Sequence, residues 1–195
     1  MKKKVFSLKE EYKKCFEYIS QSKKFIFSII GVFFIFSLIG FFVPIPEFLY
    51  NKILEIIKEI LLETENLSSV ELIFYIIFNN IKSSFFGIIF GFIFGILPLI
   101  IAIANGYILG FVSLLSVNSE GFLSLWKLFP HGIFELPAIF ISLGLGLKFG
   151  TFVFQKNKQK SFKNYLLNSL RIFLLIIIPL LILAGIIEGI LIFLN

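Results

Sequence analysis

The sequence predicts an all-α fold, a polytopic membrane helix bundle with about five transmembrane helices plus N-terminal and extracytoplasmic amphipathic helices. The chain is 58% hydrophobic with 28 phenylalanines, which is more apolar surface than a soluble domain of 195 residues can bury. Its charged residues, 15% of the total, gather between long apolar runs, and residues 83–119 carry no charge. Because the charges lie between the apolar runs, we interpret the net charge of +6 as a signal for orientation in the membrane. The lipid bilayer is the predicted partner, and no nucleic-acid partner is expected.

Residues 1–24 are predicted to form a cytoplasmic amphipathic segment. Eight lysines and three glutamates give the segment a net charge of +5. We expect a helix that lies on the membrane with its lysines toward anionic headgroups, and a docking helix for a partner protein is the alternative. The single cysteine, Cys15, can form no internal disulfide. The apolar residues at helical spacing are Val5, Leu8, Tyr12, Cys15, Phe16 and Ile19.

The first span is predicted at residues 25–43, at the start of a single transmembrane domain that covers residues 25–195. Its length and the lack of a small-residue cleavage site predict an uncleaved helix rather than a signal peptide. Pro44 and Pro46 end it. Residues 47–71 then hold six glutamates and two lysines, a net charge of −4. A stripe of isoleucines predicts an interfacial helix outside the bilayer, and Ser69 is the expected cap of the next helix.

The uncharged stretch 83–119 must turn. One straight helix of 37 residues would run roughly 55 Å, against a hydrocarbon core of ~30 Å. Pro98 is the expected hinge, because proline suits the first turn of a new helix, and this predicts spans at 72–97 and 98–117. A turn at Asn105-Gly106 is the alternative, but it leaves too few residues to cross back.

The last two spans are predicted at 132–154 and 171–194. Trp126 and Lys127 fit an interfacial belt before them, and Lys148 is expected to snorkel to the surface. The loop 155–171 carries four lysines, Arg171 and no acid. With five spans, both basic segments lie on one side and the acidic segment on the other. The positive-inside rule then predicts a multi-pass protein of the cell membrane with a cytoplasmic N-terminus.

Glycines at small-xxx-small spacing are the strongest packing signal, because bare helix faces let backbones approach closely in lipid. We expect them to pack helices within the chain, and a homodimer contact through one of these faces is the alternative. The glycines are Gly87, Gly91, Gly95, Gly106, Gly110, Gly185 and Gly189.

Polar side chains inside the predicted spans are costly and mark candidate functional sites. With five spans most of them fall in the outer half of the membrane, where they could meet. Such a cluster is either a structural network that compensates its own burial or a proton or ion path. The predicted intramembrane polar cluster is Asn79, Asn80, Lys82, Asn105, His131, Glu135 and Glu188.

An enzyme is not expected. The chain has one histidine, so no His-Glu-x-x-His zinc motif exists, and the Gly-x-Ser-x-Gly elbow of serine hydrolases is absent. No phosphate-binding loop is present either. A metal held by His131, Glu135 and Glu188 is a weak alternative. We predict no catalytic residue, no metal site and no cofactor.

Several short motifs occur in an order that resembles the stage II sporulation protein M family of integral membrane proteins, over residues 70–195 and the first span. The family implies a polytopic scaffold in a membrane complex with peptidoglycan-degrading partners, and the His-Gly-x2-Glu form is similar to its broad, uncharacterised branch. The motifs are Phe78-x-Asn80, Gly87/Gly91/Gly95, Leu97-Pro98-Leu99, Asn105-Gly106-x3-Gly110, Pro130-His131-Gly132-x2-Glu135-x-Pro137-Ala138 and Leu183-Ala184-x3-Glu188.

The predicted function is that of a non-enzymatic integral membrane protein, a scaffold or component of a membrane-remodelling or envelope complex with membrane-protein partners. The alternative is a small transporter, channel or permease subunit with a proton or ion relay at Glu135, His131 and Glu188. A water-accessible cavity that reaches Glu135 is the feature that would favour transport.

Overall fold

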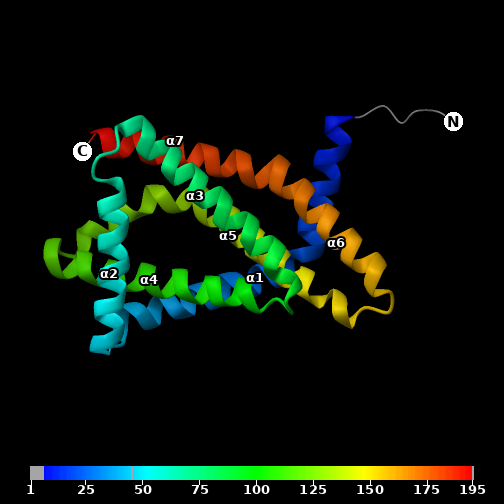
Figure 1. Cartoon of the computed structure of the whole chain (residues 1–195), viewed down its shortest axis with the longest axis horizontal. Coiled ribbons are helices and arrows are strands. Elements are labelled where there is room, and N and C mark those ends of the chain that lie inside the picture. The colour runs from blue at the N-terminus through cyan, green and yellow to red at the C-terminus, as the bar shows by residue number, and fades with distance from the viewer. Residues whose placement is uncertain (1–6, 45, 195) are drawn as a thin grey trace.

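The computed structural model is a bundle of long helices (Figure 1). The structure describes residues 7–44 and 46–194, and their side chains except at 127–131 and 188–194. This part of the chain contains no β-strand, and five of its helices are long and apolar enough to cross a membrane. The prediction of an all-α bundle with five spans is thus confirmed. The helices are α1 (Leu8–Phe42), α2 (Glu47–Thr64), α3 (Ser69–Ile89), α4 (Ile96–Glu120), α5 (Phe129–Gly150), α6 (Lys158–Ile172) and α7 (Ile178–Leu194).

The spans form two groups. Helices α1 and α4 pack along each other, and α3, α5 and α7 form the second group, with α5 also packed against α1. Figure 1 shows the groups close together near the start of α4 and diverging toward α2, which crosses the open end. The separation between the two groups of helices is therefore largest at the end that α2 crosses.

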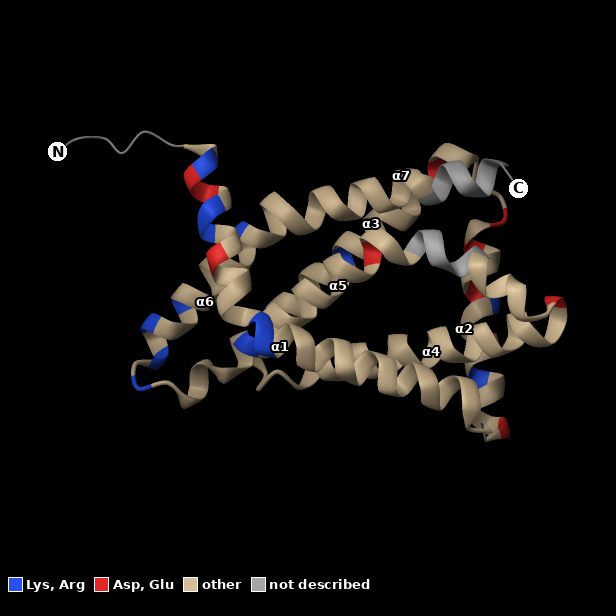
Figure 2. Ribbon diagram, turned by 180° about the vertical axis from the view of Figure 1, so that it is seen from behind, with Lys and Arg blue, Asp and Glu red and all other residues tan. Residues whose placement is uncertain are grey.

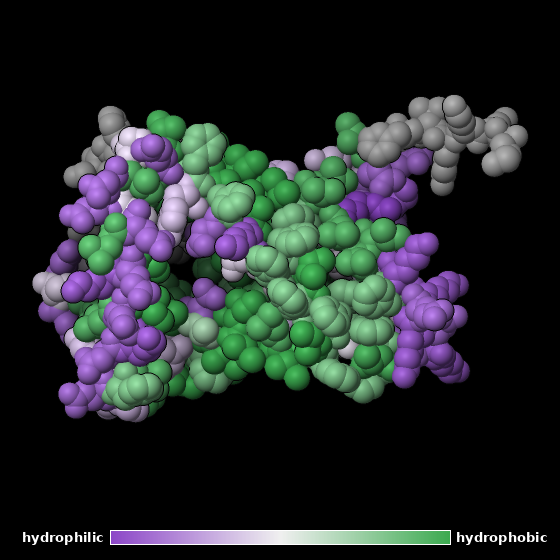
Figure 3. Space-filling view, viewed as in Figure 1, coloured by the Kyte–Doolittle hydropathy of each residue, from purple (hydrophilic) through white to green (hydrophobic). Residues whose placement is uncertain are grey.

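Charge is segregated between the two ends of the bundle (Figure 2). The basic end holds the first half of α1 and the lysine-rich α6, and the acidic end holds α2 and the connection between α4 and α5. Figure 3 shows a largely hydrophobic middle between two hydrophilic ends. A band of this kind is the surface that a bilayer requires of a spanning protein.

Helix α1 is one continuous helix of 35 residues rather than a surface helix followed by a span. It bends after its first half (Figure 1), in a region where Ser22 Oγ donates to the Tyr18 carbonyl and Ser28 Oγ to the Lys24 carbonyl. Serine bonds of this type to the preceding turn often bend helices.

The first half of α1 packs on the junction of α6 and α7, not only on lipid. Cys15 and Tyr18 share a buried cluster with Ile172, and Glu11 Oε2 pairs with Arg171 Nε at 2.6 Å. The predicted apolar face is only partly the buried one, because Leu8, Tyr12 and Phe16 are exposed. A neighbouring stripe is buried instead: Cys15, Tyr18, Ser22, Ile26, Ile29 and Phe33.

The chain turns between α3 and α4 just before Pro98. A short 3₁₀ segment, η1 (Phe90–Phe92), follows α3, and Gly95 adopts a left-handed conformation with φ of 71° before α4 begins. Glycine reaches this region without steric cost. Pro98 then lies in the first turn of α4, where its missing N–H leaves no bond unmade. The second span therefore ends earlier than predicted, and the third extends from Ile96 to Glu120.

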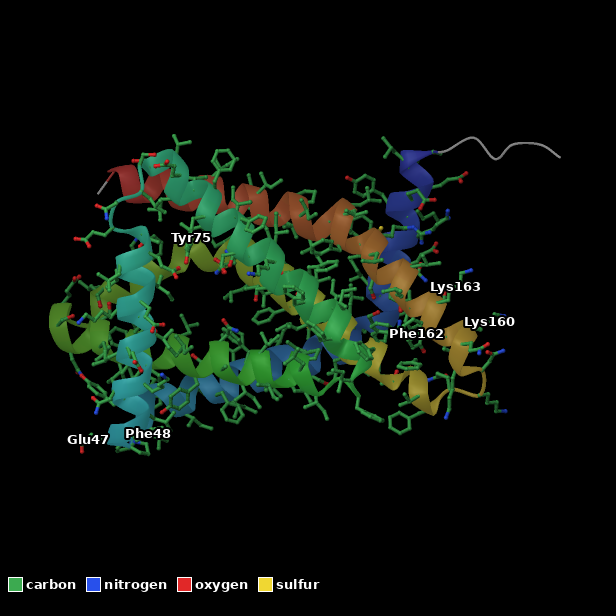
Figure 4. All side chains as sticks on the ribbon, in the orientation of Figure 1. Glu47, Phe48, Tyr75, Lys160, Phe162 and Lys163 are labelled. Carbon is green, nitrogen blue, oxygen red and sulfur yellow. The ribbon has the colours of Figure 1, made fainter. Side chains whose placement is uncertain are left out.

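Helix α2 is fastened to both groups of spans. Tyr50 packs edge-on against Phe111 of α4 with ring centroids 5.6 Å apart, and Tyr75 Oη of α3 donates to Glu63 Oε2 at 2.9 Å (Figure 4). The cap of α3 is Ser68 rather than the predicted Ser69, in a capping box with Glu71. Helix α2 thus lies across the acidic end and connects α3 with α4.

The basic segment 155–171, predicted as a loop, is mostly the helix α6. Asn157 Oδ1 accepts from the Lys160 backbone N–H at the helix start, and Phe162 packs on Phe149 with centroids 5.0 Å apart. Lys160 and Lys163 lie on α6 at the basic end (Figure 4). The π-helical turn η4 (Phe173–Ile177) joins α6 to α7, after a 3₁₀ turn, η3 (Thr151–Phe154), has ended the fourth span.

Candidate functional site

A cavity of about 820 Å³ lies between α1, α4, α5 and the 3₁₀ segment η2 (Phe122–Leu128). Its wall is mainly aliphatic and aromatic. The four polar side chains on it are Ser37, Asn105, Ser113 and Glu135. We refer to this space as the large cavity. Its volume is in the range of sites for small molecules, and its only ionisable lining group among the described residues is a carboxyl.

A second, smaller cavity of about 80 Å³ shares Asn105, Glu135 and Ile139 with the large one. Its lining is mostly amides and hydroxyls, and we call it the polar pocket. It brings together four residues of the predicted cluster, which come from three different helices. The polar residues that line it are Asn79, Asn80, Ser83, Ser84, Asn105, Glu135 and Ser142.

Three residues of the predicted cluster are not placed in this site. Lys82 is exposed and lines neither cavity, because two residues along an α-helix correspond to roughly 200° of rotation from Asn80. The side chains of His131 and Glu188 lie outside the described residues.

The polar pocket and its mouth require water. Asn79 and Asn80 make no side-chain hydrogen bond within the part of the chain that the structure describes, and Asn79 is exposed near the middle of α3. An amide left unbonded in hydrocarbon costs about 2 kcal/mol or more. Figure 3 shows a hollow beside α2 with hydrophilic residues at its rim. We therefore expect the two cavities to be hydrated, and we treat them as one space because they share Asn105, Glu135 and Ile139.

A buried lysine near the basic end forms a site that the sequence did not predict. Lys148 on α5 is only 8% exposed. Its Nζ donates to Ser22 Oγ at 3.0 Å and lies 3.7 Å from the centroid of the Tyr18 ring. The ring of Tyr165 is 5.7 Å away. The ammonium is thus held by a hydroxyl and aromatic faces. It does not reach the surface, so the prediction that Lys148 snorkels is wrong.

No carboxylate in the described part of the chain pairs with Lys148. Cation–π contact and one hydrogen bond provide its compensation. Tyr18 and Ser22 follow Cys15 at helical spacing, and this stripe was the signal available in the sequence. The predicted face at helical spacing included Cys15 but neither Tyr18 nor Ser22, so the partners of Lys148 were not predicted.

The glycines of the predicted packing set contact other helices of the same chain. A Cβ on Gly106 or Gly110 would overlap backbone carbonyl oxygens of α1, at Phe33 and Ser37, and one on Gly91 would overlap the backbone of Gly146 on α5. Side chains face the others. A Cβ on Gly87 or Gly95 would come 2.7 or 2.8 Å from Leu143 or Leu147 of α5, and one on Gly185 would overlap Ile77 of α3. Gly189 lies outside the residues with described side chains. The faces of the other six glycines are therefore packed against helices of the same chain.

Among the described residues, no three His, Cys, Asp or Glu side chains come together in a group that could hold a metal ion. The predicted candidates His131 and Glu188 lie outside that set.

The five spans, the apolar belt and the segregated charge define a polytopic α-helical membrane protein. The family model for stage II sporulation protein M (SpoIIM) matches residues 28–191, which is most of the chain. The chain belongs to this family, and the resemblance found in its motifs is confirmed.

A curated relative is similar to the chain along most of its length. The uncharacterized protein MJ0706 of Methanocaldococcus jannaschii is 30% identical over 199 residues, an alignment that covers 96% of this chain and 88% of the relative. No solved structure matches the chain.

Proposed function

We propose that this protein is a non-enzymatic membrane transport component, a small permease or channel subunit that admits a solute or ion from the acidic end of the bundle. The observation that carries the proposal is the large cavity, which reaches Glu135 and Asn105 and adjoins the polar pocket. A bundle that served only as a rigid scaffold would gain stability by filling this space. A path for a polar solute needs an opening of this kind lined by polar groups.

The proposed path is open at one end. The two groups of spans diverge toward α2 (Figure 1), whereas Gly91 of η1 packs on Gly146 of α5 toward the basic end. Lys148 and Tyr18 lie near that closed end too. Access from the acidic side with closure at the basic side is the arrangement of one state in alternating access.

The proposal includes an orientation with the basic end in the cytoplasm. We expect cysteine introduced at Lys160 to react with a membrane-impermeant thiol reagent only in inverted vesicles, and cysteine at Glu47 only in intact cells. Native Cys15 is 1% exposed and gives little background. Labelling of Lys160→Cys in intact cells would contradict this orientation and place the basic end outside the cell.

A cysteine-block experiment tests the transport function. We expect proteoliposomes that contain Ser113→Cys, with a valinomycin-set potential and an internal sodium- or proton-sensitive dye, to show protein-dependent cation entry. A bulky charged methanethiosulfonate reagent should reduce this entry about tenfold or more, because Ser113 lines the large cavity. The matched control is Ile100→Cys on the same helix, which is exposed but lines neither cavity.

Two results would count against transport. One is an absence of entry above that of empty liposomes. The other is equal sensitivity of Ser113→Cys and Ile100→Cys to the reagent, since modification would then act without reference to the cavity.

A scaffold in a membrane-remodelling or envelope complex is the second candidate. The exposed apolar side chains of α2 at the acidic end favour it, with Phe48 79% and Leu61 61% exposed. A scaffold predicts that Phe48→Asp removes co-purifying membrane partners, whereas Glu135→Gln changes stability or assembly and no flux. If the protein is a transport component, we expect the transport variants to change flux before they change stability or assembly.

A further inference from the structure

The polar pocket is lined by amide, hydroxyl and carboxyl oxygens that can accept hydrogen bonds or bind a cation. Asn105 Nδ2 donates to the Ile101 carbonyl at 2.8 Å, and Ser142 Oγ donates to the Ile139 carbonyl at 3.0 Å. One of the two amide N–H donors of Asn105 and the hydroxyl proton of Ser142 are therefore engaged by their own helices. Their oxygen lone pairs are left for whatever occupies the pocket.

Ser84 adds an independent observation. It is 3% exposed, lines the polar pocket, and its Oγ has no hydrogen-bond partner. A buried hydroxyl without a partner costs about 1–3 kcal/mol. Such a group in a native protein calls for a bound water, ion or ligand.

The charge of the pocket selects the class of occupant. Glu135 is the one ionisable side chain among the described residues of its lining, and the rest are amides, hydroxyls and aliphatic groups. Calcium and magnesium sites usually draw on several carboxylates or on substrate phosphates, and the carboxyl of Glu135 disfavours an anion. Neutral oxygens around one carboxyl suit a hard cation of single charge.

The size and depth of the pocket agree with this class. Its volume of about 80 Å³ holds an ion with one or two waters. Asn80 and Asn105 lie near the middle of α3 and α4, and coupling ions of transporters bind at mid-membrane depth between helices.

We propose that the polar pocket binds a monovalent alkali cation, with sodium as the probe, through Ser84, Asn80, Asn105 and Glu135. The ion enters through the large cavity, with which the pocket shares Asn105 and Glu135. This inference deepens the proposed function and rests on it for the use of the ion, but not for its binding.

Thermal unfolding of the purified full chain in nanodiscs tests the binding. At equal ionic strength, sodium chloride should raise the Tm by a few degrees over N-methylglucamine chloride, and the rise should saturate, because an ion that binds only the folded state stabilises it. Ser84→Ala should raise the half-saturating sodium concentration about tenfold, because the loss of one ligand worth about 1.4 kcal/mol lowers the affinity by that factor. Ser119→Ala, at an exposed serine of α4 that lines neither cavity, should respond like the wild type.

The outcomes separate this inference from the proposed function. A Tm that follows pH but not alkali cations, or the same sodium response in Ser84→Ala as in the wild type, would overturn the cation site. Asn80→Ala provides the second variant if Ser84→Ala does not purify, and radioactive sodium binding to the wild type gives a readout independent of folding. Sodium binding without flux in proteoliposomes would keep the site and reject transport. Flux without any sodium binding would keep the transport function and reject the cation site.

Discussion

Replacing Gly110 by leucine should prevent α1 and α4 from packing. A Cβ at this position would overlap the Ser37 carbonyl oxygen and lie 2.9 Å from the Phe41 backbone nitrogen. Both neighbours are backbone atoms of a helix, so no rotamer change can relieve the overlap, and the helices must separate. Overpacking typically costs about 1–3 kcal/mol, and we expect this substitution at or above that range.

The measurement is the thermal stability and monodispersity of the purified variant in detergent. The control is Gly31→Leu, since a Cβ on Gly31 meets nothing within 4 Å and leucine is the better helix former. We expect Gly31→Leu to purify with an unchanged or slightly higher Tm. If the Tm of Gly110→Leu equalled that of the wild type, the close contact between α1 and α4 would not exist in the protein.

The membrane fold could be predicted because its cause is local in the sequence. Long apolar runs and the charges between them decide which segments enter lipid, whatever the tertiary packing. The amphipathic character of α2 was readable for the same reason. The glycine spacing also marked faces where helices approach closely, although spacing alone does not say which helix is the partner.

Features that depend on tertiary contacts were predicted less well. The turn before α4 was assigned to Pro98, yet Gly95 makes it, because a left-handed residue can reverse the chain while proline fits the helix that follows. The first half of α1 was expected on the membrane, but its buried stripe meets α6, and no pattern within residues 1–24 indicates that neighbour.

The polar site was predicted in part. Asn79, Asn80, Asn105 and Glu135 line the polar pocket, since their depth in three adjacent spans followed from the span assignment. Ser84 was not predicted, because a serine in a span is usually satisfied by its own helix. Its Oγ lacks that bond here, which only coordinates reveal.

Lys148 provides the second large prediction, because its charge is buried against an aromatic face. Lys148→Glu would place a carboxylate beside the Tyr18 ring, whose face carries negative potential, and would remove the donor to Ser22. An uncompensated buried charge costs about 3–5 kcal/mol. We therefore expect Lys148→Glu to be unfolded or to aggregate on purification.

Lys148→Met tests the cause of that effect. Methionine keeps an unbranched chain of similar length without the charge, and replacing a buried ionic group by a well-packed apolar one is often neutral or stabilising. We expect its Tm to equal or exceed that of the wild type. Tyr18→Leu, which leaves the ammonium without its ring, should lower stability by about 1–2 kcal/mol in the wild type and by less in the Lys148→Met background. Equal losses in both backgrounds would show that the ring supports packing alone and that the cation–π contact contributes nothing to the fold.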